Sequence, residues 1–208
     1  MATSAGATIV TYEFSGLTSM AMGGVAANTA FTGSFTYDTG VAAQSTAYNG
    51  GTQNIFDNAY SALTLTIGGN TVSSTVPGDL ALYDSVNPPH SIPVGDSLYT
   101  FQPLSGGGPL ASTGSFAGLT PNYIYLGFVD VGGTVFSSGG SLPGNLNLAD
   151  FDSAFIGINY GPFGAGNTTT ISSLRTLQLT AAVPEPESYA LMLAGLAMIS
   201  LAARRRRA

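Results

Sequence analysis

Apolar and polar residues alternate in short stretches along the first 180 residues of the chain. Within residues 29–37 the apolar side chains Phe31, Phe35 and Tyr37 are spaced to share one face of an extended strand, and polar Thr32, Ser34 and Thr36 the other. Within residues 60–67, Leu63, Leu65 and Ile67 alternate in the same way with Thr64 and Thr66. Gly68-Gly69-Asn70 then predicts a tight turn into a returning strand at residues 71–75.

Similar short runs predict further strands, which lie at residues 8–14, 80–84, 97–102, 123–129, 155–160 and 174–180. Clusters of Gly, Pro, Ser and Asn separate them, and no segment before residue 184 has the 3.6-residue period of a helix. We therefore predict an all-β domain over residues 8–180, built as an antiparallel two-sheet sandwich of jelly-roll type.

The last residues of the chain differ from the rest. Two alternate prolines in residues 181–188 predict an extended spacer, because proline has no N–H and also biases the preceding residue toward extended backbone. Residues 189–203 are uncharged and apolar, and as a helix they would span about 22 Å of a hydrocarbon core of about 30 Å. Four arginines follow within residues 204–208. These features predict a single C-terminal transmembrane helix with its basic end in the cytoplasm.

The order of these three parts resembles the PEP-CTERM sorting signal of Gram-negative bacteria, a C-terminal motif also labelled an ice-binding protein C-terminal domain. The resemblance implies that Val183, Pro184, Glu185 and Pro186 form the recognition and cleavage box, and that Arg204, Arg205, Arg206 and Arg207 stop and orient the chain in the membrane. It also implies export and transient anchoring in the inner membrane with the β domain in the periplasm. An exosortase would then process the chain and pass the domain to the cell surface or extracellular matrix.

An exported protein also needs an N-terminal signal with a basic region and an apolar core, and residues 1–7 contain neither. Ala5-Gly6-Ala7 fits the small-residue pattern of a signal cleavage site. We therefore expect residues 1–7 to be the remnant of an export signal whose main part is encoded upstream.

The charge and composition of the chain exclude several classes of partner and several kinds of chemistry. Only 8% of residues are charged, the net charge is −6, and residues 1–183 contain nine acids and one base, Arg175. A body this acidic does not suit nucleic acid. With no cysteine and one histidine, the chain also offers no disulfide, no thiol chemistry and no usual zinc ligand set, and we expect no cofactor.

Few residues suggest chemistry. The lone His90 follows two prolines, and no Gly-x-Ser-x-Gly nucleophile motif accompanies it, so we predict no catalytic residue. Asp150 and Asp152 have a spacing found in calcium loops, with Asp38 or Asp130 as further candidates, whereas the alternative is that they cap a turn near residues 148–154. A pair of carboxylates acting as a glycosidase also remains open.

We therefore expect a non-enzymatic surface or matrix protein that associates with exopolysaccharide through exposed Tyr, Asn and Thr side chains. The alternatives are a secreted carbohydrate-active enzyme such as a glycoside hydrolase, a calcium-stabilised adhesion module and an ice-binding module. An ice-binding surface would need a flat, repeated Thr-x-Thr array, and only Thr64 with Thr66 and the run 168–170 approach that pattern.

Overall fold

Strands account for nearly all regular structure in the computed structural model, which describes residues 8–19, 25–48, 50–74, 77–86, 95–101, 112–116, 121–136, 140–159 and 168–184. Within these residues there is one 3-10 helix, η1 (Leu148–Asp150), and there is no α-helix. The strands are β1 (Thr8–Leu17), β2 (Ala30–Asp38), β3 (Gln44–Tyr48), β4 (Gly51–Ile67), β5 (Asn70–Ser74), β6 (Gly78–Val86), β7 (Gly95–Phe101), β8 (Ser112–Thr113), β9 (Tyr123–Asp130), β10 (Ser153–Asn159) and β11 (Thr168–Pro184).

Eight of these strands form a closed antiparallel barrel. The order is β2-β1-β11-β10-β9-β7-β6-β4, and β4 pairs back with β2 to complete the ring. β3 and β5 pair with β4 outside the ring, and β8 pairs with β5. The all-β prediction is correct, but the prediction of an antiparallel two-sheet sandwich is wrong, because the sheet is continuous and closed. The predicted transmembrane helix at residues 189–203 lies outside the described residues.

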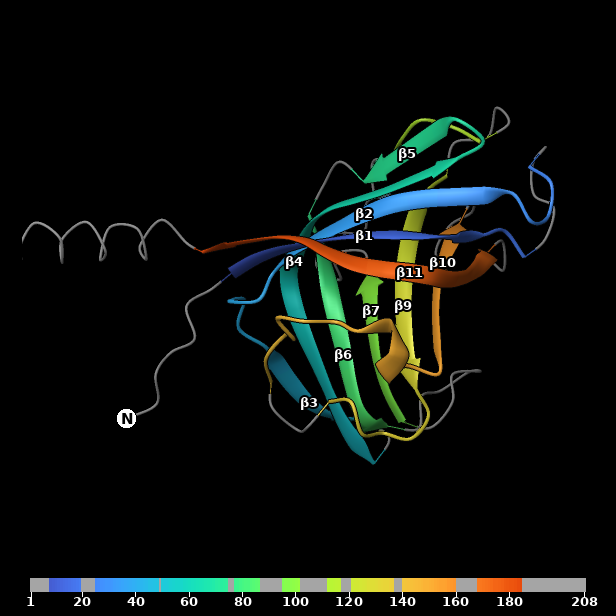
Figure 1. Ribbon diagram of the computed structural model, residues 1–208. Helices are drawn as coiled ribbons and strands as arrows, with labels where there is room; N and C mark the ends of the chain where they lie inside the picture. Colours follow the sequence, from blue (N-terminus) through green and yellow to red (C-terminus); the bar gives the residue numbers. More distant parts are fainter. Residues whose placement is uncertain are drawn as a thin grey trace, which may run out of the picture.

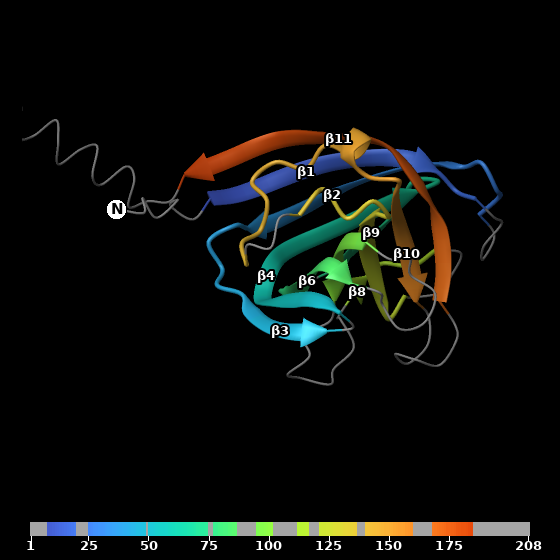
Figure 2. The same ribbon diagram turned by 90° about the horizontal axis from the view of Figure 1, so that it is seen from below.

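Two long strands close the barrel by running through both of its layers. β4 pairs with β6 through Thr52–Phe56 and at Tyr60, and with β2 through Tyr60–Ile67, and each pairing contains a register shift. β11 pairs with β10 through Thr168–Ser173 and then with β1 as far as Pro184. Figures 1 and 2 show the layer of β1, β2 and β11 lying across the layer of β6, β7, β9 and β10. The sequence pattern identified only residues 60–67 of β4 and residues 174–180 of β11, so the connection between the layers was missed.

The barrel interior is filled by the apolar sets that the alternation predicted. Phe35, Tyr37, Leu63, Leu65 and Ile67 are all fully buried, which confirms the predicted inward faces of β2 and β4. The predicted turn between β4 and β5 is also confirmed, since Gly68 and Gly69 have φ values of 56° and 81°, in the left-handed region that glycine adopts without strain.

A long connection between β9 and β10 covers one side of the barrel. We call its described residues, 131–136 and 140–152, the strap; it is the yellow and gold segment that passes in front of β6 and β7 in Figure 1. Its apolar side chains join the core, and these are Phe136, Leu142, Leu146 and Phe151. Two core tyrosines hold its backbone: the Tyr12 hydroxyl accepts the Leu146 N–H at 2.7 Å, and the Tyr37 hydroxyl donates to the Pro143 carbonyl.

The end of β11 extends into the segment that we assigned to the spacer. Ala182, Val183 and Pro184 pair with Val10, Ile9 and Thr8 of β1. The rest of the spacer, the apolar segment 189–203, the basic segment 204–208 and the N-terminal residues 1–7 lie outside the described residues.

Of the helical structure in the described part of the chain, none is long and apolar enough to cross a membrane.

Candidate functional site

Polar side chains of neighbouring strands gather on the outer face of the layer that contains β1, β2 and β11. Because alternate residues of a strand point to opposite faces, the residues between the core positions all point outward here. The strand register places them in rows across β11, β1, β2, β4 and β5. One row is Gln178, Glu13, Ser34, Thr64 and Ser73, the next is Thr176, Ser15, Thr32, Thr66 and Thr71, and a shorter one is Thr11 and Thr36. We call this surface the hydroxyl face.

Hydrogen bonds between strands order the side chains of the hydroxyl face. Four pairs of side chains are bonded through their hydroxyl oxygens. The distance between the two oxygens is 2.7 Å for Ser15–Thr176, 2.8 Å for Ser34–Thr64, 2.7 Å for Thr66–Thr71 and 3.0 Å for Thr11–Thr36. A hydroxyl has one donor and two acceptor positions, so each pair keeps unused positions of both kinds. The surface can therefore donate to a polar ligand and also accept from it, with side chains that are already oriented.

A shallow groove of about 440 Å³ lies in this face. Its lining is Glu13, Phe14, Ser15, Thr32, Gly33, Ser34, Thr64, Thr66, Thr176 and Gln178. Gly33 is required here, because a Cβ atom on it would lie 2.2 Å from the Phe14 ring and 2.4 Å from the Thr64 carbonyl oxygen. The groove has the volume of a small-ligand site, but its lining is far more polar than that of most such sites.

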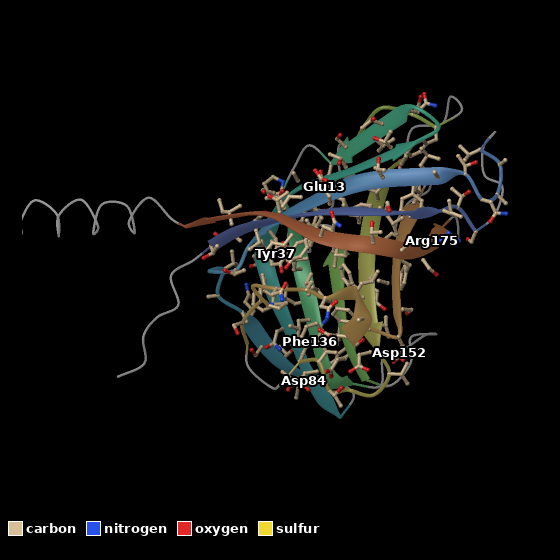
Figure 3. The ribbon with its side chains drawn as sticks, in the orientation of Figure 1. Glu13, Tyr37, Asp84, Phe136, Asp152 and Arg175 are labelled. Atoms are coloured by element: carbon tan, nitrogen blue, oxygen red, sulfur yellow. The ribbon has the colours of Figure 1, made fainter. Side chains whose placement is uncertain are left out.

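Glu13 is the one charged residue in the groove lining. Its side chain is exposed, and the register places it between Gln178 and Ser34. It forms no hydrogen bond or ion pair with any other residue that the structure describes. Figure 3 shows Glu13 and Arg175 at separate places along the layer.

The other acidic residues in the described ranges interact with groups of the protein itself. Carboxylates of Asp38, Asp79, Asp96, Asp130 and Asp152 accept backbone N–H groups. Asp57 accepts from Gln44, Asp150 accepts from Asn147, and Asp84 also has a partner. The acids that accept backbone N–H groups therefore help to hold the backbone of their partners in place.

Asp130 shows this role most clearly. Its carboxylate accepts the N–H groups of Thr134 at 2.7 Å, Gly132 at 2.9 Å and Val135 at 3.2 Å, all in the strap. These bonds, led by that of Thr134, hold the pKa of Asp130 below its ordinary value because they stabilise the ionised form.

The calcium candidates Asp150 and Asp152 have similar structural partners. Asp150 ends η1, whose N-cap is Asn147, and the Asp152 carboxylate accepts the Val131 N–H at 2.7 Å. Across the described ranges, no three His, Asp or Glu side chains come together in a way that could hold a metal ion. Asp150 therefore lies in the turn that the alternative names, whereas Asp152 bonds to the strap residue Val131, outside residues 148–154.

The remaining candidate residues of the sequence analysis are placed only in part. Val183 and Pro184 lie at the end of β11, whereas Glu185, Pro186, Arg204, Arg205, Arg206, Arg207 and His90 lie outside the described residues. The groove lining contains a single carboxylate, so paired-carboxylate hydrolysis there would need a second acid from outside this lining.

Sequence reasoning missed the hydroxyl face as a unit. The alternating Thr and Ser residues of β2 and β4 were visible, but β1 and β11 contribute residues from opposite ends of the chain. Ser15 and Thr176, for example, are 161 positions apart. A signal did exist, because both end strands have polar residues at alternate positions, but their pairing with each other did not follow from the pattern.

A row of aromatic rings lies outside the core cluster on the other layer. Tyr83 lies 5.7 Å from Tyr48 and 6.3 Å from Tyr99, and Phe155 lies 6.1 Å from Tyr99 and 6.2 Å from Tyr125, measured between ring centroids. Tyr99 is only 5% exposed and the hydroxyl of Tyr83 accepts a hydrogen bond from Gln53. These rings pack mainly against one another, so the hydroxyl face is the better candidate for ligand binding.

Comparison with known proteins identifies the end of the chain. Residues 182–207 match the PEP-CTERM protein-sorting motif, which confirms the resemblance seen in the sequence. The motif supports an exported protein that is sorted through an exosortase and has a membrane-proximal C-terminal signal. Neither the curated proteins nor the solved structures gave a match to this chain.

Proposed function

We propose that this protein is a non-enzymatic component of the bacterial cell surface or extracellular matrix, and that it associates with exopolysaccharide through the hydroxyl face. The observation that carries this proposal is the set of registered Ser and Thr rows around the groove.

The chemistry of the two surfaces is complementary. A polysaccharide presents many hydroxyl groups, each of which can donate and accept, and the hydroxyl face presents the same kind of group. Hydrogen bonds between Ser15 and Thr176 and between Ser34 and Thr64 already fix these side chains. Binding therefore costs little side-chain entropy, and water can bridge positions that do not meet directly.

The position of the sorting motif agrees with this role. The motif begins at residue 182, and the strand pairing of β11 ends at Pro184. Exosortase processing on the C-terminal side of Pro184 would leave every strand pair of the barrel in place. The released or transferred product would then be the intact barrel with its hydroxyl face.

Ice binding is a second candidate, favoured by the rows of Thr residues in register on β2, β4 and β5. The groove argues for polysaccharide instead, because an ice surface is flat and has no groups that enter a hollow. A thermal hysteresis measurement on the purified protein separates the two candidates.

Co-sedimentation of the processed protein with the exopolysaccharide of its own cells tests the proposal. Replacing Thr32 or Thr66 with Val keeps the β-branched shape and removes one hydroxyl, so each variant should bind about threefold to tenfold more weakly. Thr46→Val on the exposed strand β3 is the matched control and should bind like the wild type. Equal binding by all four proteins would refute a role for the hydroxyl face.

The sorting part is tested separately in cells with and without the exosortase. We expect intact mass measurements to find the shorter form only in cells that have the enzyme. Equal processing in both strains would contradict the exosortase assignment while leaving the polysaccharide proposal open to its own test.

A further inference from the structure

The carboxylate of Glu13 differs from every other described carboxylate in having no described partner. The other acids of the described ranges interact with backbone N–H groups or with polar side chains. Glu13 instead points outward from the middle of β1 into the groove. The strand could hold any polar residue at this outward position, so the negative charge is not explained by the fold.

The neighbours of Glu13 are neutral and polar. Gln178 and Ser34 flank it across the strands, and Thr11 and Ser15 occupy the next outward positions along β1, each about 7 Å away at the rise of an extended strand. No lysine exists in the chain, and Arg175 lies outside the groove lining. The groove is therefore a negatively charged point surrounded by hydroxyl and amide groups.

This arrangement does not suit a divalent metal ion. Calcium takes six to eight oxygen ligands, usually including more than one carboxylate, and the groove lining provides one carboxylate. It does suit an ammonium group, which needs one anionic acceptor and a few neutral acceptors within hydrogen-bond reach. The hydroxyls around Glu13 then match the hydroxyls on the same ligand.

We propose that Glu13 makes the groove selective for polysaccharides that contain amino sugars with free, protonated amines. This inference rests on the proposed binding of polysaccharide at the hydroxyl face, and it names the ligand class. The ammonium of one sugar residue lies against the Glu13 carboxylate, while Ser34, Thr32 and Gln178 contact hydroxyls of the same or the adjoining residue. Acidic polysaccharides are rejected, because their carboxylates would face Glu13 without a cation between them.

The expected selectivity follows from the exposure of the site. A charge-assisted hydrogen bond at a partly open groove should favour the protonated amine over a neutral acetamide by about fivefold to tenfold in Kd. Salt should reduce this preference, because the Debye length falls to about 8 Å at physiological ionic strength.

The test compares the Kd values of glycans of equal length for the processed protein. The probes are a glucosamine oligomer with free amines, its N-acetylated form and a galacturonic acid oligomer, all at slightly acidic pH and low salt. We expect the free amine to bind best and the uronic acid worst. Glu13→Gln should make the first two probes equal and improve the third. Because Glu13 is exposed and contacts no described partner, the variant should melt at the wild-type temperature.

Asp150→Asn is the matched control, since it removes the same charge from an exposed residue of the strap, outside the groove lining. It should keep the wild-type order of the three probes. If Asp150→Asn also abolishes the preference, net charge is responsible and the role of Glu13 is overturned. Equal binding of the amine and acetamide probes to the wild type also overturns the inference. The proposed function still stands in that case if Thr32→Val weakens binding to the exopolysaccharide.

A cationic peptide is the other ligand that a lone carboxylate could attract. An oligolysine of matched charge is therefore included as a fourth probe. The assignment to a glycan would be overturned by two results together. Oligolysine binding would depend on Glu13 but not change in Thr32→Val, and binding of the glucosamine oligomer would also not change in Thr32→Val. Loss of exopolysaccharide sensitivity to Thr32→Val would instead refute the proposed function itself.

Discussion

The two tyrosines that hold the strap give a sharp test of how the barrel is covered. Tyr12→Phe and Tyr37→Phe each remove one hydroxyl and keep the ring, so neither creates a large cavity. The two sites differ in what the missing hydroxyl leaves behind. Tyr12 leaves the N–H of Leu146, a residue that is 4% exposed, whereas Tyr37 leaves the carbonyl of half-buried Pro143.

The expected costs follow from this difference in burial. A buried N–H without a partner costs about 1–3 kcal/mol, whereas the carbonyl of a residue that is only half-buried should lose about the net value of one hydrogen bond, about 0.5–1.5 kcal/mol. Tyr12→Phe should therefore destabilise the protein more than Tyr37→Phe. For a chain of this size, 2 kcal/mol corresponds to a fall of about 4–8 °C in Tm. Because the two rings stack with centroids 6.1 Å apart and hold the same strap, the double variant should not be additive.

Chemical denaturation of the two single variants and the double variant measures these costs, and amide hydrogen exchange at Leu146 reports the strap directly. Tyr83→Phe is the matched control, because its hydroxyl accepts from Gln53 at 2.9 Å and both side chains are only half-buried. It should cost no more than the net value of one hydrogen bond, about 0.5–1.5 kcal/mol, and should leave amide exchange at Leu146 unchanged. A larger loss of stability for Tyr37→Phe than for Tyr12→Phe, or unchanged exchange at Leu146 in Tyr12→Phe, would show that burial does not set the cost of the two missing hydrogen bonds.

Three further predictions concern packing, the end of the barrel and pH. Gly33→Ala should destabilise the protein by about 1–3 kcal/mol in denaturant titrations, because the new Cβ would overlap the Phe14 ring. Gly144→Ala is the control and should be nearly neutral, because the space around Gly144 is open. A chain that ends at Pro184 should keep the full-length Tm by circular dichroism, but one that ends at Ser173 should not fold, because β1 then loses its β11 partner. Because the pKa of Asp130 is lowered in the folded protein, its carboxylate stabilises the fold at pH values above its ordinary pKa of about 3.8. This contribution is lost as the pH falls through the folded-state pKa. Asp130→Asn should therefore be less stable than the wild type at neutral pH and should lose less stability on acidification.

Each of these predictions has an outcome that contradicts it. Equal stability of the two glycine variants would show that the close approach at Gly33 is relieved without cost. Cooperative unfolding of the chain that ends at Ser173 would show that the pairing of β1 and β11 is not needed to close the barrel. An acid unfolding profile of Asp130→Asn that parallels the wild type would show that the strap N–H groups do not stabilise the ionised carboxylate.

The local features of this protein follow from short stretches of consecutive residues. Alternation placed Phe35, Leu63 and Ile67 in the core, because side-chain direction in a strand depends only on the position of a residue relative to its neighbours. Gly68-Gly69 determined a tight turn for the same local reason, since both residues need positive φ. The sorting motif at residues 182–207 is also recognised from consecutive residues.

Closure of the sheet, which creates the candidate site, depends on pairing between strands that are far apart in the chain. β4 and β11 each continue from one layer into the other, and β11 ends against β1, so residues near both ends of the chain share one outer face. Strand alternation states which side of a strand is polar but not which strand lies beside it. Pairing partners are chosen by packing and hydrogen bonding across more than 160 positions, as between Ser15 and Thr176, so the groove around Glu13 exists only in the folded barrel.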